Sequence, residues 1–154
     1  MFFPSSKVII RHPSDSNKLL LIKRNVHGAL YYEPAGGRVE IDFANRVAES
    51  LESCAIREVK EELGISIDID DYVGSYYFFW IIAPDKCSSC AVFVGKILDA
   101  DASFQTNADT CELSIEFIWV SIDDILEKRI SIDPTYVGLE NVLMKYCQQV
   151  KNII

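Results

Sequence analysis

The sequence predicts an α/β (α+β) domain with a mixed β-sheet. Runs of β-branched and aromatic residues, which are typical of strands, occur both before and after a central segment at residues 50–63. In that segment apolar residues recur every fourth position, which indicates an amphipathic helix. Strands on both sides of a central helix are typical of mixed domains. The chain has 154 residues, so we expect residues 1–154 to form a single domain.

The first third of the chain is predicted to contain two strands joined by a turn, then a short extended segment and a loop. The strands are rich in Val, Ile and Leu, and the turn contains Pro, Ser, Asp and Asn. The extended segment ends at Pro34, and two glycines open the loop. In chain order, the segments are residues 7–11 (strand), 12–17 (turn), 18–24 (strand), 29–34 (extended) and 35–48 (loop).

A helix is predicted from residue 50 to residue 63. Ser50 is a suitable N-cap, and Gly64 stands where a left-handed residue often ends a helix. We expect the helix to bury one apolar stripe against the sheet. The expected stripe consists of Leu51, Ala55, Ile56, Val59 and Leu63.

Three strands and two helices are predicted after the central helix. The strands are rich in aromatic and β-branched residues. The last helix is expected to begin with Pro134 in its first turn, a position that proline favours. The predicted segments are strands 72–82, 89–98 and 115–122, a short helix at 123–128 and a final helix at 133–152.

The charge distribution limits the possible partners. The net charge is −8, which disfavours binding to polymeric nucleic acid. Residues 1–38 nevertheless carry a net charge of +4, from six Lys or Arg against Asp15 and Glu33, so the remainder carries −12. This asymmetry either reflects chance clustering on a solvated surface or sets a basic segment opposite an acidic one across a cleft. The six basic residues are Lys7, Arg11, Lys18, Lys23, Arg24 and Arg38.

Cysteine content and hydropathy favour a cytoplasmic protein. The five cysteines have no framework spacing, which suits reduced thiols. Cys87 and Cys90 form a CSSC pair, but no second pair or nearby histidine accompanies them. We interpret them as incidental thiols at the end of a hairpin. No apolar run reaches the roughly 18 residues of a membrane span, and the N-terminal run is too short for a signal peptide.

Three carboxylates crowd the end of the central helix. At about 100° per residue, Glu58 and Glu62 lie one turn apart, with Glu61 beside them. Like charges at this spacing and near a helix C-terminus are unfavourable. A divalent cation would relieve the repulsion, whereas a solvated acidic face would only tolerate it. Helix geometry alone leaves both readings open.

The residues around this cluster resemble the Nudix box. Residues 57–65 (REVKEELGI) match its core pattern, Glu49 stands where the box has an upstream glutamate, and residues 34–37 (PAGG) resemble its opening. The resemblance covers about residues 33–65 and implies the Nudix fold, an α/β/α sandwich with a mixed sheet. One departure is the eleven residues between Gly37 and Glu49, where the family has five. We therefore expect a six-residue insertion near residues 42–47.

The resemblance implies metal-dependent hydrolysis of a nucleoside diphosphate linked to another group, with Mg²⁺ or Mn²⁺. It makes Glu58 and Glu62 the expected metal ligands, Glu61 a further ligand or a water-orienting group, and the Gly36 carbonyl a backbone ligand. Arg57 would orient a glutamate. The family often adds a late carboxylate, for which Glu112 is favoured over Glu116. The expected catalytic group is thus Arg57, Glu58, Glu61 and Glu112.

The expected substrate is a small nucleotide, most simply a nucleoside triphosphate split into monophosphate and pyrophosphate. ADP-ribose or a sugar nucleotide is the alternative, because the PAG opening is frequent among hydrolases of those compounds. A Nudix-like binding module without catalysis and a structural domain with an acidic face are the alternatives from other classes. No membrane partner is expected, and the chain is expected to be a monomer or homodimer. Candidate base-stacking residues are Tyr31, Tyr32, Tyr76, Phe78 and Trp80.

Overall fold

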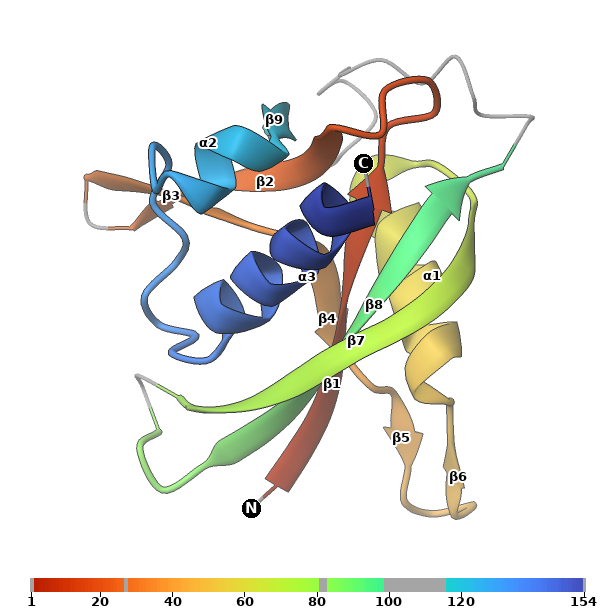
Figure 1. Cartoon of the computed structure of the whole chain (residues 1–154). Helices are drawn as coiled ribbons and strands as arrows, with labels where there is room; N and C mark the ends of the chain where they lie inside the picture. Colours follow the sequence, from red (N-terminus) through yellow and green to blue (C-terminus); the bar gives the residue numbers. More distant parts are fainter. Residues whose placement is uncertain (1, 27, 81–82, 99–115, 154) are drawn as a thin grey trace.

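A mixed β-sheet between helices forms the body of the protein. The structure is a computed structural model that describes residues 2–26, 28–80, 83–98 and 116–153. Helix α1 (Leu51–Leu63) covers one face of the sheet, and α2 (Ile122–Leu126) and α3 (Leu139–Ile153) cover the other (Figure 1). The predicted fold class is therefore confirmed.

The sheet is organised around its first strand, β1. The central order is β3-β2-β1-β8-β7, with β4 also pairing β1 and β9 also pairing β2. β1 and β8 run parallel, and the other pairs in this sheet are antiparallel. The strands are β1 (Phe2–Arg11), β2 (Lys18–Val26), β3 (Ala29–Glu33), β4 (Ala35–Arg38), β7 (Ile67–Phe79), β8 (Cys87–Ile97) and β9 (Phe117–Ser121).

β1 contributes side chains to the core on both faces of the sheet. Along its length, one of its edges pairs first with β4 and then with β2. Its alternating side chains place Val8 and Ile10 in the cluster under α1, and Ile9 in the cluster under α3. One edge of β1 pairs with β4 at residues 5–8 and with β2 at residues 10 and 11. The change of partner opens the sheet between β2 and β4, beside Lys7.

The central helix forms as predicted, although its buried stripe differs. The Ser50 hydroxyl accepts a hydrogen bond from the Ser53 N–H, and Gly64 ends the helix with φ 72°. Leu51 and Ile56 were expected to be buried but are 37% and 38% exposed. Cys54 is buried instead. Leu51 is the first residue of the helix, and Ile56 lies at one side of the buried stripe.

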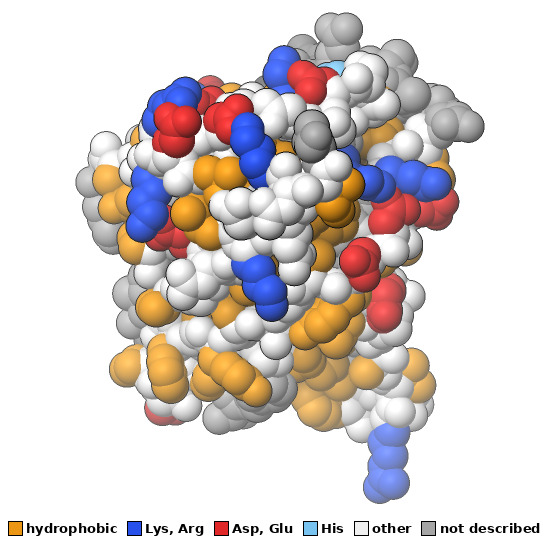
Figure 2. Space-filling view, viewed as in Figure 1, with side chains coloured by type: hydrophobic (Ala, Val, Ile, Leu, Met, Phe, Trp, Pro, Cys, Tyr) orange, Lys and Arg blue, Asp and Glu red, His pale blue; other side chains and the backbone are white. Residues whose placement is uncertain are grey.

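The predicted loop at residues 35–48 is largely strand, which corrects the prediction. Its start forms β4, and the residues expected to hold the insertion form a hairpin of β5 (Ile41–Asp42) and β6 (Val47–Ala48). The Glu49 N–H donates to the Glu40 carbonyl at 3.2 Å, which closes the base of the hairpin. Its side chains Phe43 and Val47 are exposed, and Figure 2 shows hydrophobic side chains gathered in this lower part of the molecule.

The final helix begins later than predicted, at Leu139, so Pro134 is not in its first turn. Asp133 explains the difference, because its N–H donates to the Tyr32 carbonyl of β3 and its carboxylate accepts from the Thr135 N–H. These bonds hold residues 133–138 in a turn beside the sheet. The turn brings Tyr136 to a cavity described below.

The remaining predictions agree with the structure within a few residues, with two larger exceptions. β1 begins at Phe2, five residues before the predicted strand. β7 begins at Ile67, five residues before the predicted strand, because the alternating IDID sequence also pairs with β8. Cys87 and Cys90 lie at the start of β8, after the β7–β8 turn, as expected. Cys111 and Glu112 lie outside the described residues. None of the described helices is long and apolar enough to cross a membrane.

Candidate active site

Two glycines of β4 allow this strand to lie close to both of its neighbours, β1 and the glutamate helix. A Cβ at Gly36 would lie 2.0 Å from the Ser6 carbonyl oxygen, and the φ of this glycine is +157°. A Cβ at Gly37 would lie 2.3 Å from the Glu58 carboxyl carbon. Glycine is therefore required at Gly36 for β4 to lie close to β1, and at Gly37 for the Glu58 carboxylate to rest on the β4 backbone.

Glu62 points from α1 toward the same strand and is largely buried. The Gly36 N–H donates to its carboxylate at 3.4 Å, and its side chain is 12% exposed. Burial raises the pKa of Glu62 to about 7, although the nearby charges of Lys7 and Arg24 act to lower it. A bound cation would favour the ionised form of this carboxylate.

Arg57 joins the glutamates of this region through its guanidinium group. It makes two hydrogen bonds to Glu49, at 3.1 and 2.5 Å, and donates to Glu58 at 2.9 Å and Glu61 at 3.1 Å. It also donates to the Arg38 carbonyl of β4 at 3.0 Å. The hydrogen bonds to Glu49 are the largest contribution to a raised pKa of Arg57. Despite the expected insertion, the hairpin returns Glu49 to the start of α1.

The donor atoms of this cluster suit a hard divalent cation. Carboxylate and carbonyl oxygens, which Mg²⁺ and Mn²⁺ prefer, are the polar groups that α1 and β4 place together. Within the residues that the structure describes, however, no three Asp, Glu, His or Cys side chains converge on one point as a metal site. Arg57 engages the carboxylates of Glu58 and Glu61, whereas Glu62 turns toward Gly36.

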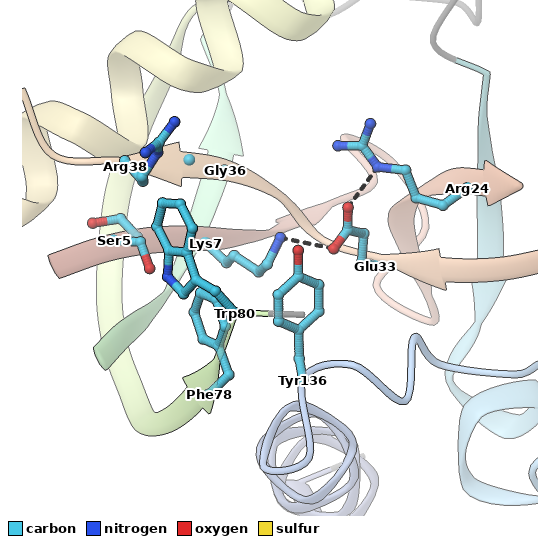
Figure 3. A pocket seen from close by; sticks show the side chains of 11 residues that line it. Ser5, Lys7, Arg24, Glu33, Gly36, Arg38, Phe78, Trp80 and Tyr136 are labelled. Atoms are coloured by element: carbon cyan, nitrogen blue, oxygen red, sulfur yellow. Dashed lines mark hydrogen bonds and ion pairs between the residues drawn. The ribbon is translucent and has the colours of Figure 1, made fainter. Parts of the chain in front are cut away.

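A cavity of about 280 Å³ opens on the other side of β4, where β1 and β2 diverge. Figure 3 shows basic, acidic and aromatic side chains facing it from several strands and from the turn before α3. Its charged lining residues are Lys7, Arg24, Glu33 and Arg38, and its aromatic ones are Phe78, Trp80 and Tyr136.

Glu33 is held between two cations at the end of this cavity. Lys7 donates to one of its oxygens at 3.0 Å and Arg24 to the other at 2.6 Å. Burial opposes ionisation of Glu33, but Lys7 and Arg24 more than offset it and lower its pKa. Burial likewise opposes the charge on Lys7, yet Glu33 and Tyr136 leave its pKa raised. Because Lys7 and Arg24 together carry more charge than Glu33, this part of the cavity is basic.

The aromatic side of the cavity is built partly from residues that the sequence suggested. Phe78 and Trp80 line the cavity, whereas Tyr76 is buried in the core under α3. Tyr31 and Tyr32 are not among the lining residues. Tyr136, which sequence reasoning missed, meets the Phe78 ring edge to face with centroids 4.9 Å apart. Nothing in the local sequence around Tyr136 indicated that the turn at Asp133 would bring it there.

The basic N-terminal segment is divided between this site and the surface. Lys7, Arg24 and Arg38 line the cavity next to the glutamate helix, as the cleft hypothesis expected. The other three pair with acids elsewhere, including Lys23 with Glu116 at 2.9 Å. Glu116 is exposed, and Glu112, the favoured late carboxylate, is among the undescribed residues.

A helix of glutamates packed on a glycine strand, beside a basic cavity, defines a site suited to a phosphate-containing ligand and a cation. The comparisons with known proteins agree with this class. The NUDIX domain profile matches residues 2–137, and the chain belongs to that family. It is therefore a Nudix hydrolase domain, of a family of pyrophosphohydrolases.

Solved structures share the fold over almost the whole chain. A MutT protein from Methanosarcina mazei Go1 has 25% identity and a TM-score of 0.68, covering 97% of this chain and 96% of that chain. The ORF135 protein of E. coli has 21% identity and a TM-score of 0.64, with coverages of 94% and 89%. A NUDIX hydrolase from Nitrosomonas europaea has 20% identity and a TM-score of 0.65, with coverages of 99% and 90%. A search of curated proteins found no significant match.

Proposed function

We propose that the protein is a metal-dependent nucleoside triphosphate pyrophosphohydrolase, releasing a nucleoside monophosphate and pyrophosphate. The observation that carries the proposal is the position of the glutamate helix directly across β4 from the basic aromatic cavity. Gly37 contacts Glu58 on one side of this strand, and both Gly36 and Gly37 also line the cavity. A nucleotide with its base in the cavity could thus reach the glutamates with its phosphates.

The size of the cavity favours a triphosphate over ADP-ribose or a sugar nucleotide. Its volume of about 280 Å³ lies near the lower limit of ordinary ligand sites. Such a volume suits one nucleoside, whereas ADP-ribose carries a second ribose that would need space of its own. Phe78, Trp80 and Tyr136 provide apolar surface for a base, and Lys7 and Arg24 provide positive charge.

Each residue of the glutamate cluster has a proposed role. Glu58 and Glu62 would be the principal ligands of Mg²⁺ or Mn²⁺, helped by the Gly36 carbonyl, and Glu61 would bind metal or orient the attacking water. Arg57 would position Glu58 and Glu61 through its hydrogen bonds. When bound, the cation would neutralise phosphate charge and lower the pKa of a coordinated water. Glu112 would supply the late carboxylate.

The test is a comparison of kcat/KM for nucleoside triphosphates, ADP-ribose and sugar nucleotides in the presence of Mg²⁺ or Mn²⁺. We expect a triphosphate to be preferred, with mass spectrometry identifying monophosphate and pyrophosphate as products. A preference for ADP-ribose of more than tenfold would reject the substrate class. Absence of turnover with every compound would reject catalysis and favour a binding module.

A second experiment addresses the metal and the late carboxylate. Mg²⁺ should raise the melting temperature, because it binds only the folded cluster. Glu112→Gln should reduce kcat strongly, whereas Glu116→Gln should matter less because Glu116 is exposed and paired with Lys23. A larger loss of kcat in Glu116→Gln than in Glu112→Gln would identify Glu116 as the late carboxylate instead.

A further inference from the structure

The basic residues that line the cavity differ in their interaction partners within the protein. Lys7 and Arg24 are both committed to Glu33 by ion pairs. Among the described cations that line the cavity, Arg38 is the one without a carboxylate partner. Its guanidinium carbon instead lies 4.8 Å from the centre of the Trp80 ring system, a cation–π contact. Its charge is therefore available to an anionic ligand.

Trp80 is a fixed aromatic surface at the edge of the cavity. Its indole N–H donates to the Ser88 hydroxyl at 3.0 Å, and its ring packs against Phe3 with centroids 5.4 Å apart. These contacts hold the orientation of the indole. Figure 3 shows Arg38 above Trp80, on the side of the cavity away from Arg24 and Glu33. Arg38 thus covers the part of the Trp80 ring that would otherwise be open to a ligand in the cavity.

The backbone of Arg38 is anchored next to the glutamates. It follows Gly37, which contacts Glu58, and its carbonyl accepts a hydrogen bond from Arg57 at 3.0 Å. Its long side chain is exposed. Arg38 therefore extends from a fixed point beside the proposed phosphate position and can rotate between that position and the Trp80 ring.

We propose that Arg38 binds the phosphates of the substrate and that this movement uncovers Trp80 for stacking with the base. The inference rests on the proposed function, in which the ligand is a nucleotide with a phosphate chain. An exposed cation–π contact is weaker than a charge-assisted, bidentate pair between arginine and phosphate. Phosphate therefore draws Arg38 from the ring, and the exposed indole face accepts the base.

The movement of Arg38 from Trp80 to phosphate couples binding of the phosphates to binding of the base. A nucleoside without phosphates must displace Arg38 from Trp80 and offers the guanidinium nothing in return. A triphosphate replaces the lost contact with a stronger one. Removing the guanidinium should therefore weaken triphosphate binding while leaving nucleoside binding unchanged or tighter. A residue that merely supported the fold would weaken both.

Binding by Arg38→Gln and the unchanged protein tests this directly. The probes are uncleavable α,β-methylene analogues of the four common nucleoside triphosphates and the four parent nucleosides, titrated calorimetrically with Mg²⁺. We expect triphosphate Kd to rise roughly tenfold to 100-fold, the effect of losing a charged hydrogen bond. Nucleoside Kd should stay equal or fall. Arg38→Lys, which keeps the charge without the planar fork, should lose less triphosphate affinity.

A matched control and an optical measurement separate the exchange from a general charge effect. Lys86, whose ammonium lies 5.9 Å from the same ring but outside the cavity lining, provides the control, and Lys86→Gln should alter neither affinity. Trp119→Phe leaves Trp80 as the one tryptophan of the chain. In that background pyrophosphate alone should change the indole fluorescence, and adding Arg38→Gln should abolish the change.

The outcomes distinguish this inference from the proposed function. Equal weakening of nucleoside and triphosphate binding in Arg38→Gln, or no change in either, would overturn the role of Arg38 while leaving the substrate class intact. Failure of the unchanged protein to bind any analogue would overturn both. Circular dichroism melting of Arg38→Gln establishes that the variant is folded at the temperature of the titration.

Discussion

The two sides of β4 use ion pairs in opposite ways. On the α1 side one arginine, Arg57, lies among several glutamates. On the cavity side one glutamate, Glu33, lies between Lys7 and Arg24. The first arrangement leaves an excess of negative charge and the second an excess of positive charge. The two meet beside β4, where Arg24 also lies 3.9 Å from Glu62.

The difference in burial shows what each arrangement does. The side chains of Lys7 and Glu33 are 9% and 3% exposed, so their charges depend on each other for stability. The Arg57 cluster is more accessible, and its excess of carboxylates can be compensated by an added cation. We infer that the cavity pair serves the fold first, and that the glutamate cluster serves chemistry. The predictions below test that division.

The largest expected effect is on catalysis, in Glu62→Gln. Loss of a ligand charge with little change of shape should lower kcat by about 100-fold or more if this side serves chemistry. Glu52→Gln, on the first turn of the same helix, is the matched control and should stay within about twofold. Steady-state kinetics with Mg²⁺ provide the measurement. Full activity of Glu62→Gln would show that Glu62 is not a metal ligand.

The same variant should become more stable than the unchanged protein when metal is removed. Glu62 has a folded pKa of about 7, raised by burial from an ordinary 4.5. The unfolded chain therefore releases this proton at lower pH, and ionisation costs folding stability as pH rises from 4.5, levelling above 7. Melting with EDTA at pH 5 and pH 8 should show the larger gain at pH 8. A gain confined to pH 5 would contradict this sign.

The next effect is on folding, in Glu33→Gln. Removing this carboxylate leaves Lys7 buried without its ion-pair partner, which should cost about 3–5 kcal/mol. Because the folded pKa of Glu33 is lowered, its contribution should be present above pH 4.5 and disappear as pH falls through the folded value. Urea denaturation at several pH values tests both. Glu140→Gln, which breaks an exposed pair with Lys128, should cost less than about 1 kcal/mol.

A smaller effect is expected from Arg57→Lys. Lysine keeps the charge but cannot bind Glu49 through two nitrogens while also holding Glu58 and Glu61. We expect kcat to fall roughly tenfold to 100-fold, with a weaker apparent affinity for Mg²⁺. A melting temperature that falls as far as that of Glu33→Gln would instead show that Arg57 serves mainly the fold.

The smallest effect should follow from replacing residues 42–47 with two glycines. The Glu40 N–H and the Glu49 carboxylate are joined at 2.8 Å, and these residues also pair through their backbones below the replaced segment. Glu49 should therefore remain on Arg57, and kcat/KM should stay within about threefold in the assay used for Arg57→Lys. A loss as large as that of Arg57→Lys would mean that the hairpin itself supports the site.

The parts predicted best were those whose causes lie close together in the sequence. Ser50, Gly64 and the fourfold apolar spacing act within a single helix, and that helix formed with the predicted ends. The family resemblance depended on the same segment. Two stripe positions failed because burial depends on how far the sheet extends, which no local pattern contains. Cys54, which the predicted stripe did not include, is buried.

The cavity was harder to predict because its lining comes from distant segments. Lys7, Arg24 and Tyr136 meet only after β1 changes partner and the turn at Asp133 bonds to β3. Pro134 suggested a helix start, but tertiary hydrogen bonds determined the local conformation instead. The IDID alternation before Tyr72 was a readable strand pattern that the prediction left out.

The closed base of the β5–β6 hairpin has a consequence for engineering. Since Glu40 and Glu49 are joined across its base, the chain between them forms a loop whose two ends are already fixed. Loop-closure entropy grows only slowly with length, so added residues there carry a small cost. The tip at Phe43 is thus a suitable place to graft an epitope or a binding peptide. Such a fusion would display its cargo next to α1 without lengthening either terminus.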